Sequence, residues 1–427
     1  MTNAHDGFDP NAAPWRDDPH PALAEFRRDQ PVFHCPAADA WIITRYEDVA
    51  AVVSDGERFS SAQLLTRLGG GVCPEAQRVM ARGYPPSQTR SIIMLDPPDH
   101  GPIRKVVASA FTPRRVAGLE PRVRAIADGL VDAFAADGQV DLVKQFAYPL
   151  PLAVIMELLE IPVADRDDIK RWGDDRVSLV WGELSDEEQV RCANSYLEFQ
   201  SYLGALVDER RARPGDDFIS DLASAVTSEG RQLERAELIG QLISVVSAGH
   251  ETTTNLIAMA VALLLTTGQW DDLVADPTRA SAVVEETLRY DGPAKGIPRT
   301  TTSDVELSGV RIPAGDRVLA MMTSANHDDR FFTDPDRFDI HRPRPDHPHL
   351  GFGRGHHYCA GAGLARLEGR VALEVLVDRL PGMRLESADP LQFTANIVLR
   401  TVRQLRLRWE VGTAPAPERR PEALVAG

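Results

Sequence analysis

The chain has 427 residues, of which 43% are hydrophobic and 26% charged, and its formal net charge at pH 7 is −16. This composition is that of a globular protein with a large core. The negative charge argues against nucleic acid as a partner, because phosphate binding requires a basic surface. The longest apolar run, 256–265, has ten residues, whereas a membrane span needs about 20. We therefore expect no membrane segment, and a polar N-terminus without a secretory signal favours the cytoplasm.

The chain shows no internal repeat and no linker that would divide it. We predict one domain over residues 1–427 and a monomer, with flexible ends at 1–13 and 412–427. The four cysteines are far apart in the sequence and form no CxxC pair. Reduced thiols and the absence of structural zinc are therefore expected.

Helical patterns outnumber strand patterns along the chain. Residues 41–44 alternate as a strand does, and residues 122–136 carry apolar side chains at helical spacing. Residues 234–267 contain no proline, which predicts a helix about 50 Å long at about 1.5 Å per residue. Residues 305–322 alternate again, with turns at Ser308-Gly309 and Ala314-Gly315. The predicted fold class is mainly α with a smaller β region.

A glycine-rich loop that leads into Cys359 is the strongest local signal. Gly351, Gly353 and Gly355 precede the cysteine, and residues 360–376 have the apolar spacing of a helix. Cys359 is therefore expected at or just before a helix N-terminus, where backbone N–H groups and the helix dipole favour a thiolate. The glycines allow a tight turn and the close approach of a flat ligand.

Two other roles for Cys359 fit the loop taken alone. A cysteine is often buried for packing only. It is also a nucleophile in some enzymes, here with His356 or His357 as its base. An enzyme that uses Cys359 as a nucleophile and binds no haem would be colourless when purified.

A polar stretch interrupts the apolar pattern of the long predicted helix. Residues Gly249–Asn255 contain no apolar side chain. Glycine and threonine are poor choices for a helix interior, and such departures from local rules are expected at functional sites. A solvated stretch of helix is the alternative, but apolar residues flank the stretch on both sides.

These two motifs resemble those of the cytochrome P450 family, and the likeness follows the family's order from about Pro14 to Trp409. The stretch Phe352-Gly353-x-Gly355-x-His357-x-Cys359-x-Gly361 resembles the family's haem-binding signature. The stretch Ala248-Gly249-x-Glu251-Thr252 resembles its oxygen-binding segment. The resemblance implies the P450 fold, with a long central helix over haem b. It also implies that Cys359 is the iron ligand, whose thiolate favours cleavage of the O–O bond.

The resemblance gives roles to further residues. Glu251 and Thr252 would form the catalytic proton relay, in a helix that opens locally beside the iron. His100, Arg104 and Arg299 would bind the anionic propionates, and Phe352 would cover the sulfur. The complete set of implied cofactor-binding residues is His100, Arg104, Ala248, Gly249, Arg299, Phe352, Gly353, His357 and Gly361.

A structural cluster is also implied by the resemblance. Glu286 and Arg289 lie three residues apart on one helix face, and the family joins such a pair to an arginine of a later Pro-rich loop. Arg337, in the segment Pro335–Phe338, fits that position. If buried, the cluster should tolerate no single truncation.

Four segments are implied to line the substrate pocket, namely 64–92, 243–247, 294–297 and 396–399. The Gly-rich region between Ser60 and Ile92 is expected to be a mobile cover. The sequence leaves three alternatives for the partner of Lys295, namely a substrate carboxylate, a propionate or solvent. The mostly apolar lining predicts a small or medium-sized substrate, by analogy from secondary metabolism such as antibiotic biosynthesis. The candidate contacts are Ser244, Ser247, Ala294, Lys295, Ile297 and Ile397.

No flavin or iron–sulfur domain is visible in the sequence, so the resemblance implies electrons from NAD(P)H through a ferredoxin reductase and a ferredoxin. Lys105, Arg114, Arg115 and Arg354 would form a basic docking patch for the ferredoxin, or they are ordinary surface charges. The resulting prediction is a haem-thiolate monooxygenase that uses O2 to hydroxylate or epoxidise its substrate. Desaturation, phenol coupling and nitration remain alternatives, as does a haem protein that only senses gas or carries electrons.

Overall fold

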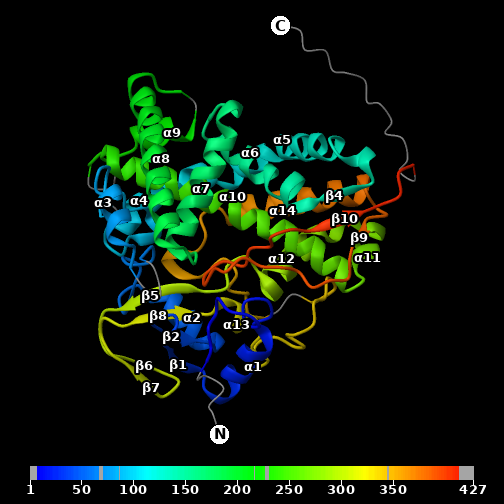
Figure 1. The fold of residues 1–427 in the computed structure, drawn as a ribbon, viewed down its shortest axis with the longest axis horizontal. Helices are drawn as coiled ribbons and strands as arrows, with labels where there is room; N and C mark the ends of the chain where they lie inside the picture. The colour runs from blue at the N-terminus through cyan, green and yellow to red at the C-terminus, as the bar shows by residue number, and fades with distance from the viewer. Residues whose placement is uncertain are drawn as a thin grey trace.

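The computed structural model describes residues 7–66, 71–85, 87–215, 217–226, 230–343 and 346–412. Of the predicted flexible ends, 1–6 and 413–427 lie outside these ranges. Helices fill the upper part of the molecule in Figure 1, and most strands lie in its lower part, near the N-terminus. The predicted fold class, mainly α with a smaller β region, is confirmed.

The α-helices include one long helix, α10, which lies in the middle of the helical upper part of Figure 1. In chain order they are α1 (His20–Asp29), α2 (Tyr46–Ser54), α3 (Pro74–Met80), α4 (His100–Ala108), α5 (Pro113–Asp132), α6 (Pro149–Leu158), α7 (Arg166–Trp181), α8 (Asp186–Ala212), α9 (Phe218–Ser224), α10 (Arg235–Thr266), α11 (Trp270–Ala275), α12 (Ala280–Asp291), α13 (Met322–Ala325) and α14 (Ala362–Arg379).

The largest sheet has five strands in the order β1-β2-β8-β5-β3. Its strands are β1 (Val32–Cys35), β2 (Ala40–Ile43), β3 (Phe59–Ser60), β5 (Ile297–Thr301) and β8 (Arg317–Ala320). Only β2 and β8 pair in parallel, and the other neighbours are antiparallel. A three-stranded sheet joins β4 (Gln139–Asp141), β10 (Arg406–Arg408) and β9 (Arg384–Leu385), and a hairpin joins β6 (Val305–Leu307) to β7 (Val310–Ile312).

The predicted helix at 234–267 is α10, which matches the prediction to within one residue at each end. Glu234 and Glu237 form a reciprocal capping box at its start, which satisfies backbone N–H groups that have no partner within a helix. Its side chains are buried on several faces because α6, α7, α8, α12 and α14 all pack against it. The middle of α10 is therefore an interior position, and the polar stretch there is not a solvated surface.

Phe8 packs the start of the described N-terminal segment against the rest of the molecule. Phe8 is buried, and its ring packs edge-on against Trp15, Phe26 and Phe33. Its carbonyl oxygen also accepts a hydrogen bond from the Cys35 thiol at 3.3 Å. One aromatic side chain thus anchors this segment, although polar residues surround it in the sequence.

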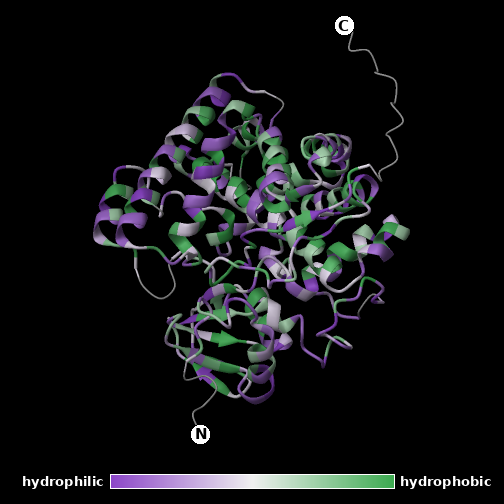
Figure 2. Ribbon diagram, turned by 45° about the vertical axis from the view of Figure 1, so that its right-hand side comes forward, coloured by the Kyte–Doolittle hydropathy of each residue, from purple (hydrophilic) through white to green (hydrophobic). Residues whose placement is uncertain are grey.

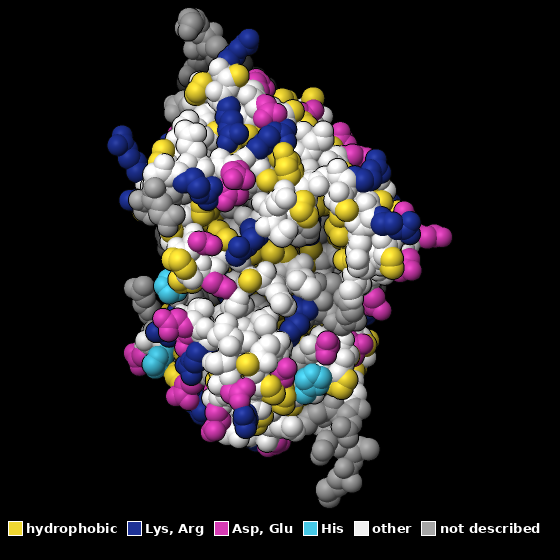
Figure 3. Space-filling model, turned by 90° about the vertical axis from the view of Figure 1, so that its left-hand side faces the viewer, with side chains coloured by type: hydrophobic (Ala, Val, Ile, Leu, Met, Phe, Trp, Pro, Cys, Tyr) yellow, Lys and Arg dark blue, Asp and Glu magenta, His cyan; other side chains and the backbone are white. Residues whose placement is uncertain are grey.

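Hydrophobic residues lie mainly on the strands and on the inward faces of the helices (Figure 2). On the face shown in Figure 3, basic and acidic side chains are interspersed and form no basic stripe. Within the described part of the chain, no helix has the length and apolar character to span a bilayer.

Candidate active site

The loop before Cys359 turns tightly and places the cysteine ahead of a helix. Gly353 and Gly355 adopt φ angles of +69° and +71°, a left-handed conformation that favours glycine. A side chain at Gly355 would come within 2.9 Å of the Ser54 backbone. The Cys359 N–H donates to the Phe352 carbonyl at 2.9 Å, and α14 begins at Ala362. The expected position just before a helix N-terminus is confirmed.

Opposing effects act on the thiol of Cys359. Burial raises its pKa, whereas the Gly361 backbone N–H and the Arg104 and Arg366 guanidinium groups oppose that rise. A bound metal cation would deprotonate such a thiol outright. No histidine within the described ranges hydrogen-bonds the sulfur, because His357 instead pairs its Nε2 with the Ser61 hydroxyl at 3.0 Å.

Arg366 of α14 links Phe352 of the cysteine loop to α12. The Arg366 guanidinium stacks on the Phe352 ring, 4.5 Å from its centroid, and also pairs with Glu285 at 2.6 Å. This network, reaching from α14 to α12, fixes the loop in place.

Basic and imidazole groups from three separate segments lie near the cysteine, with His100 and Arg299 buried and Arg104 and His357 half-buried. The His100 and His357 rings lie 4.4 Å apart, and Arg104 donates to the Tyr358 carbonyl at 2.5 Å. Burial lowers the pKa of Arg299 to about 10 and of His100 to about 4. Tertiary packing therefore brings the cationic side chains of Arg104 and Arg299, which are far apart in the sequence, close to the cysteine loop.

Two of these groups have unused hydrogen-bonding capacity. Arg299 is 3% exposed, and within the described ranges its one hydrogen bond goes to the Pro298 carbonyl at 2.8 Å, with no carboxylate paired to it. His100 Nε2 is buried without a partner among the same residues. The Asp96 charge acts on Arg299 without a direct ion pair, and a buried guanidinium without a paired anion is costly, so this position suits an anionic group. A thiol, buried cations and an orphaned imidazole fit a haem with its iron and propionates.

The polar stretch of α10 continues the helix without a break. The Thr252 hydroxyl donates to the Ala248 carbonyl at 2.7 Å, and α10 is a continuous α-helix through this turn. The local opening that the resemblance implied is not seen. A side chain at Gly249 would meet Ile155 of α6 at 2.6 Å, so close helix packing requires glycine there.

Glu251 lies in a setting that favours a protonated carboxyl group. Burial raises its pKa to about 7, the nearby Asp174 adds to the rise, and His250 opposes it. The Thr401 hydroxyl donates to Glu251 Oε1 at 3.4 Å. Asp174, which is 39% exposed, lies 3.7 Å from His250 Nε2 and 2.6 Å from Lys170 Nζ. The charges of His250 and of Asp174 on α7 thus act on Glu251.

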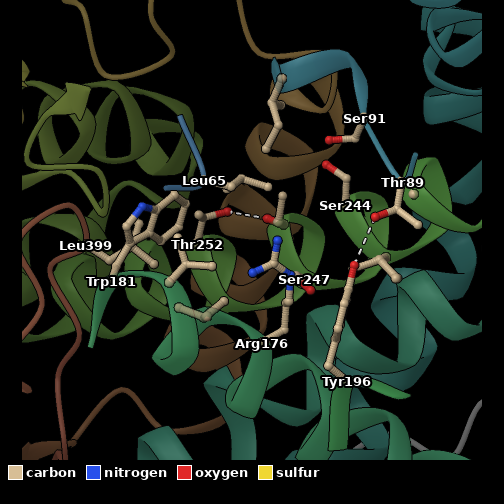
Figure 4. Close-up of a pocket in the computed structure, with 16 residues that line it drawn as sticks. Leu65, Thr89, Ser91, Arg176, Trp181, Tyr196, Ser244, Ser247, Thr252 and Leu399 are labelled. Carbon is tan, nitrogen blue, oxygen red and sulfur yellow. Dashed lines mark hydrogen bonds between the residues drawn. The ribbon is translucent and has the colours of Figure 1, made fainter. Parts of the chain in front are cut away.

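A cavity of about 680 Å³, part of it continuous with solvent, lies against α10 on the side of Thr252. Most of its wall is apolar. Figure 4 shows side chains from α7, α8, α10 and the loops converging on it. The lining consists of Leu65, Thr89, Ser91, Ile93, Arg176, Val177, Val180, Trp181, Tyr196, Gly240, Ile243, Ser244, Ser247, Ala248, Thr252 and Leu399.

The predicted substrate contacts divide into two groups. Ser244 and Ser247 line the cavity, whereas Ala294, Lys295, Ile297 and Ile397 do not. Lys295 is buried, and the charged groups that act on it are Arg400, Asp291 and Arg16.

The contribution of α7 and α8 to the cavity was missed from the sequence. A signal was present: Ile169, Trp172, Gly173, Arg176, Val177 and Val180 recur at helical spacing, so that one charged residue lies on an otherwise apolar stripe. A cation on the inward face of a helix indicates a binding role.

The predicted structural cluster is corrected at one position. Glu286 and Arg289 are buried and pair at 2.8 Å, but the third member is Arg342, whose Nε lies 3.1 Å from Glu286 Oε1. The Arg337 side chain is 69% exposed and faces Asp339. Arg337 contributes only its carbonyl, which accepts from Arg289 Nη2 and Arg342 Nη2 at 3.1 and 2.7 Å. The loop direction turns the backbone of Arg337, not its side chain, toward the cluster.

The comparisons with known proteins agree with this site. The family profile described as Cytochrome P450 matches residues 278–381. The mycinamicin IV hydroxylase/epoxidase of Micromonospora griseorubida is 40% identical over 421 residues, which cover 96% of this chain and 100% of the relative. Cytochrome P450 107B1 of Saccharopolyspora erythraea is 38% identical over 398 residues, covering 92% and 95%.

Solved structures give the same result. Cytochrome P450 CREJ in complex with (4-ethylphenyl) dihydrogen phosphate superimposes with a TM-score of 0.87 at 33% identity, covering 95% of this chain and 100% of that one. Sequence identity and fold therefore agree over nearly the full length. The chain belongs to the cytochrome P450 family of monooxygenases.

Proposed function

We propose that this P450 monooxygenase binds haem b through Cys359 and uses O2 to hydroxylate or epoxidise a small to medium-sized organic molecule. The observation that carries the proposal is that Ala248 and Thr252 of α10 line the same cavity as the apolar side chains that would contact a substrate. The relatives support this reaction class, since one is named a hydroxylase/epoxidase. We infer a substrate from secondary metabolism on the same basis.

Haem, when bound, supplies the iron at which molecular oxygen is activated. Cys359 would hold the iron, and the Gly361 N–H would stabilise negative charge on its sulfur. Arg299 and Arg104 would pair with the propionates, because forked guanidinium donors match carboxylates. His100 Nε2, which lacks another partner among the described residues, and His357 would add hydrogen bonds to the same groups.

Glu251 and Thr252 would deliver protons to the oxygen-binding side of the cavity. With its pKa raised to about 7, Glu251 both holds and releases a proton near neutral pH. Thr252 lines the cavity, and its hydroxyl can donate or accept. Asp174 and His250 would resupply Glu251 from solvent.

Electron delivery by a ferredoxin and its NAD(P)H-dependent reductase completes the proposal. Lys105, Arg114 and Arg354 are exposed, and exposed cations attract an acidic partner. Arg115 is less suited, because it already pairs with Asp221 at 2.7 Å. Turnover should therefore depend on an added ferredoxin and should weaken as salt screens the contact.

The carbon monoxide difference spectrum of the reduced protein tests the assignment of Cys359. The wild type should give the red-displaced Soret band of sulfur ligation, and Cys359→Ala should lose it. Cys35→Ala, which removes a buried thiol next to Phe8, serves as the control and should keep the band. An unchanged spectrum in Cys359→Ala would refute the proposal.

A further inference from the structure

Arg176 projects from α7 into the cavity against α10 and is the one cation that lines it in the described part of the chain. The other α7 residues that line the cavity, Val177, Val180 and Trp181, are apolar, and the buried Asp175 beside Arg176 pairs with Arg191 instead. Figure 4 shows the guanidinium group at the end of an extended side chain that points into the space between the labelled residues. An arginine in this position must have either a structural partner or a ligand.

No structural partner of opposite charge is present. Within the described ranges, no carboxylate pairs with Arg176 and no hydrogen bond from its guanidinium is formed. Tyr196, whose ring centroid lies 5.1 Å from the guanidinium carbon, is its one close aromatic neighbour. Arg176 is half-buried, and burial lowers the pKa of its guanidinium. Such a charge is destabilising for the empty protein.

Arg171, five residues earlier on α7, shows the ordinary arrangement. It lies on the outer side of the helix and pairs with Asp168 and Glu198 at 3.0 and 2.9 Å. No Asp or Glu lines the cavity, so Arg176 has no corresponding counter-ion there. The contrast indicates that the negative charge for Arg176 comes from outside the chain.

A second donor lies on the opposite wall. The Ser247 hydroxyl is buried without a hydrogen-bond partner in the described part of the chain, although a helical serine can usually bond the carbonyl four residues earlier. Ser247 lines the same cavity as Arg176, and both are labelled in Figure 4. Together they offer charged and neutral donors to one group of acceptor oxygens.

We propose that the substrate carries an anionic head group, such as a carboxylate, which Arg176 and Ser247 bind at the α7–α10 wall. This inference rests on the proposed function and specifies its substrate class. The rest of the substrate is apolar, because Ile93, Val180 and Trp181 line the remaining wall. Thr252 lies on the same cavity, so oxidation takes place on the apolar body and leaves the head group intact.

The test is a titration of the haem-loaded protein with matched acids and alcohols. Binding is measured by the change of the Soret band that accompanies the change of spin state. The probes are decanoic acid, dodecanoic acid and 4-butylbenzoic acid, each paired with its neutral alcohol, with decyl phosphate to separate carboxylate from phosphate recognition. The variants are Arg176→Met, Arg176→Lys and, as the control on the same helix, Arg171→Met. The carbon monoxide spectrum of every preparation is recorded first, so that failure of haem-thiolate assignment is detected separately.

The wild type and Arg171→Met should bind at least one acid about 10- to 100-fold more tightly than its alcohol, the range expected for a charge-assisted hydrogen-bonded pair. Arg176→Met should lose this preference while binding the alcohol unchanged, and Arg176→Lys should keep part of it. Tighter binding of decyl phosphate than of decanoic acid would still support an anionic head group but assign it to a phosphate ester.

The proposal would be overturned if the wild type bound none of the acids more tightly than the corresponding alcohol. It would also be overturned if Arg176→Met kept the same preference for acids as the wild type. Thermal unfolding adds an independent readout. Removing an uncompensated charge should leave the melting temperature of Arg176→Met equal or higher. A lower melting temperature together with an unchanged acid preference would assign Arg176 to packing against Tyr196 instead.

Discussion

Arg342 Nε lies 3.1 Å from the Glu286 carboxylate although 56 residues separate them in the chain. Glu286 therefore accepts from two arginines, since Arg289 pairs with it from the same helix. The Asp339 backbone N–H donates to Glu286 as well, at 3.0 Å. One buried carboxylate thus joins α12 to the loop that precedes the cysteine motif.

Arg342→Ala should destabilise the protein by about 3 kcal/mol, because it leaves part of the Glu286 charge buried without compensation. Arg337→Ala should change stability by less than about 0.5 kcal/mol, since its side chain is exposed. Denaturant unfolding of the haem-loaded protein measures both. Equal losses in the two variants would show that the assignment of Arg342 to the cluster is wrong.

Proton delivery by Glu251 predicts a pH-dependent coupling of oxygen use to product. Its pKa is raised to about 7 by burial, so the acid form predominates below pH 7 and is lost above it. Product formed per NAD(P)H consumed should therefore fall as pH rises from about 6 to about 8. Glu251→Gln should lower the coupling at every pH and remove this dependence, whereas Glu251→Asp should keep it. Identical pH profiles for the wild type and Glu251→Gln would contradict the relay.

Glu368 of α14 is 1% exposed, and burial raises its pKa to about 8 against the smaller opposing effect of Thr253. The folded state therefore holds a proton that the unfolded chain releases near pH 4.5. Its contribution to stability is present at low pH and is lost as pH rises toward 8. Glu368→Gln, which stays neutral, should gain stability over the wild type by on the order of 4 kcal/mol between pH 5 and pH 8.5. Unfolding curves at the two pH values decide this, and a constant difference between the two proteins would refute it.

Lys295 gives the opposite dependence on pH. It is 4% exposed, and burial together with the Arg400 charge lowers its pKa to about 7. The unfolded chain therefore binds more protons between pH 7 and about 10.5, and stability rises with pH across that window. Lys295→Met should be more stable than the wild type at pH 6, with the advantage shrinking by pH 9.5. An advantage that does not change with pH would show that folding does not lower the pKa of Lys295.

Local sequence predicted those features that depend on short-range chemistry. The absence of proline from 234–267 predicted α10, the turns at Ser308-Gly309 and Ala314-Gly315 predicted the strands β6 to β8, and the glycines before Cys359 predicted a tight turn. These patterns depend on backbone preferences within a few residues. The P450 family followed from the spacing of the residues around Cys359 and Thr252.

The partners of individual side chains were decided only by the tertiary structure. Phe8 becomes an anchor because it meets Phe26 and Phe33, and Arg342 replaces Arg337 because the loop turns one side chain inward and the other outward. Arg176 lies on an apolar stripe of its helix in the sequence, but only the structure shows that no described carboxylate pairs with it and that it lines the cavity. Whether a charge has a counter-ion depends on which distant segments pack beside it, and backbone periodicity carries no information about those segments.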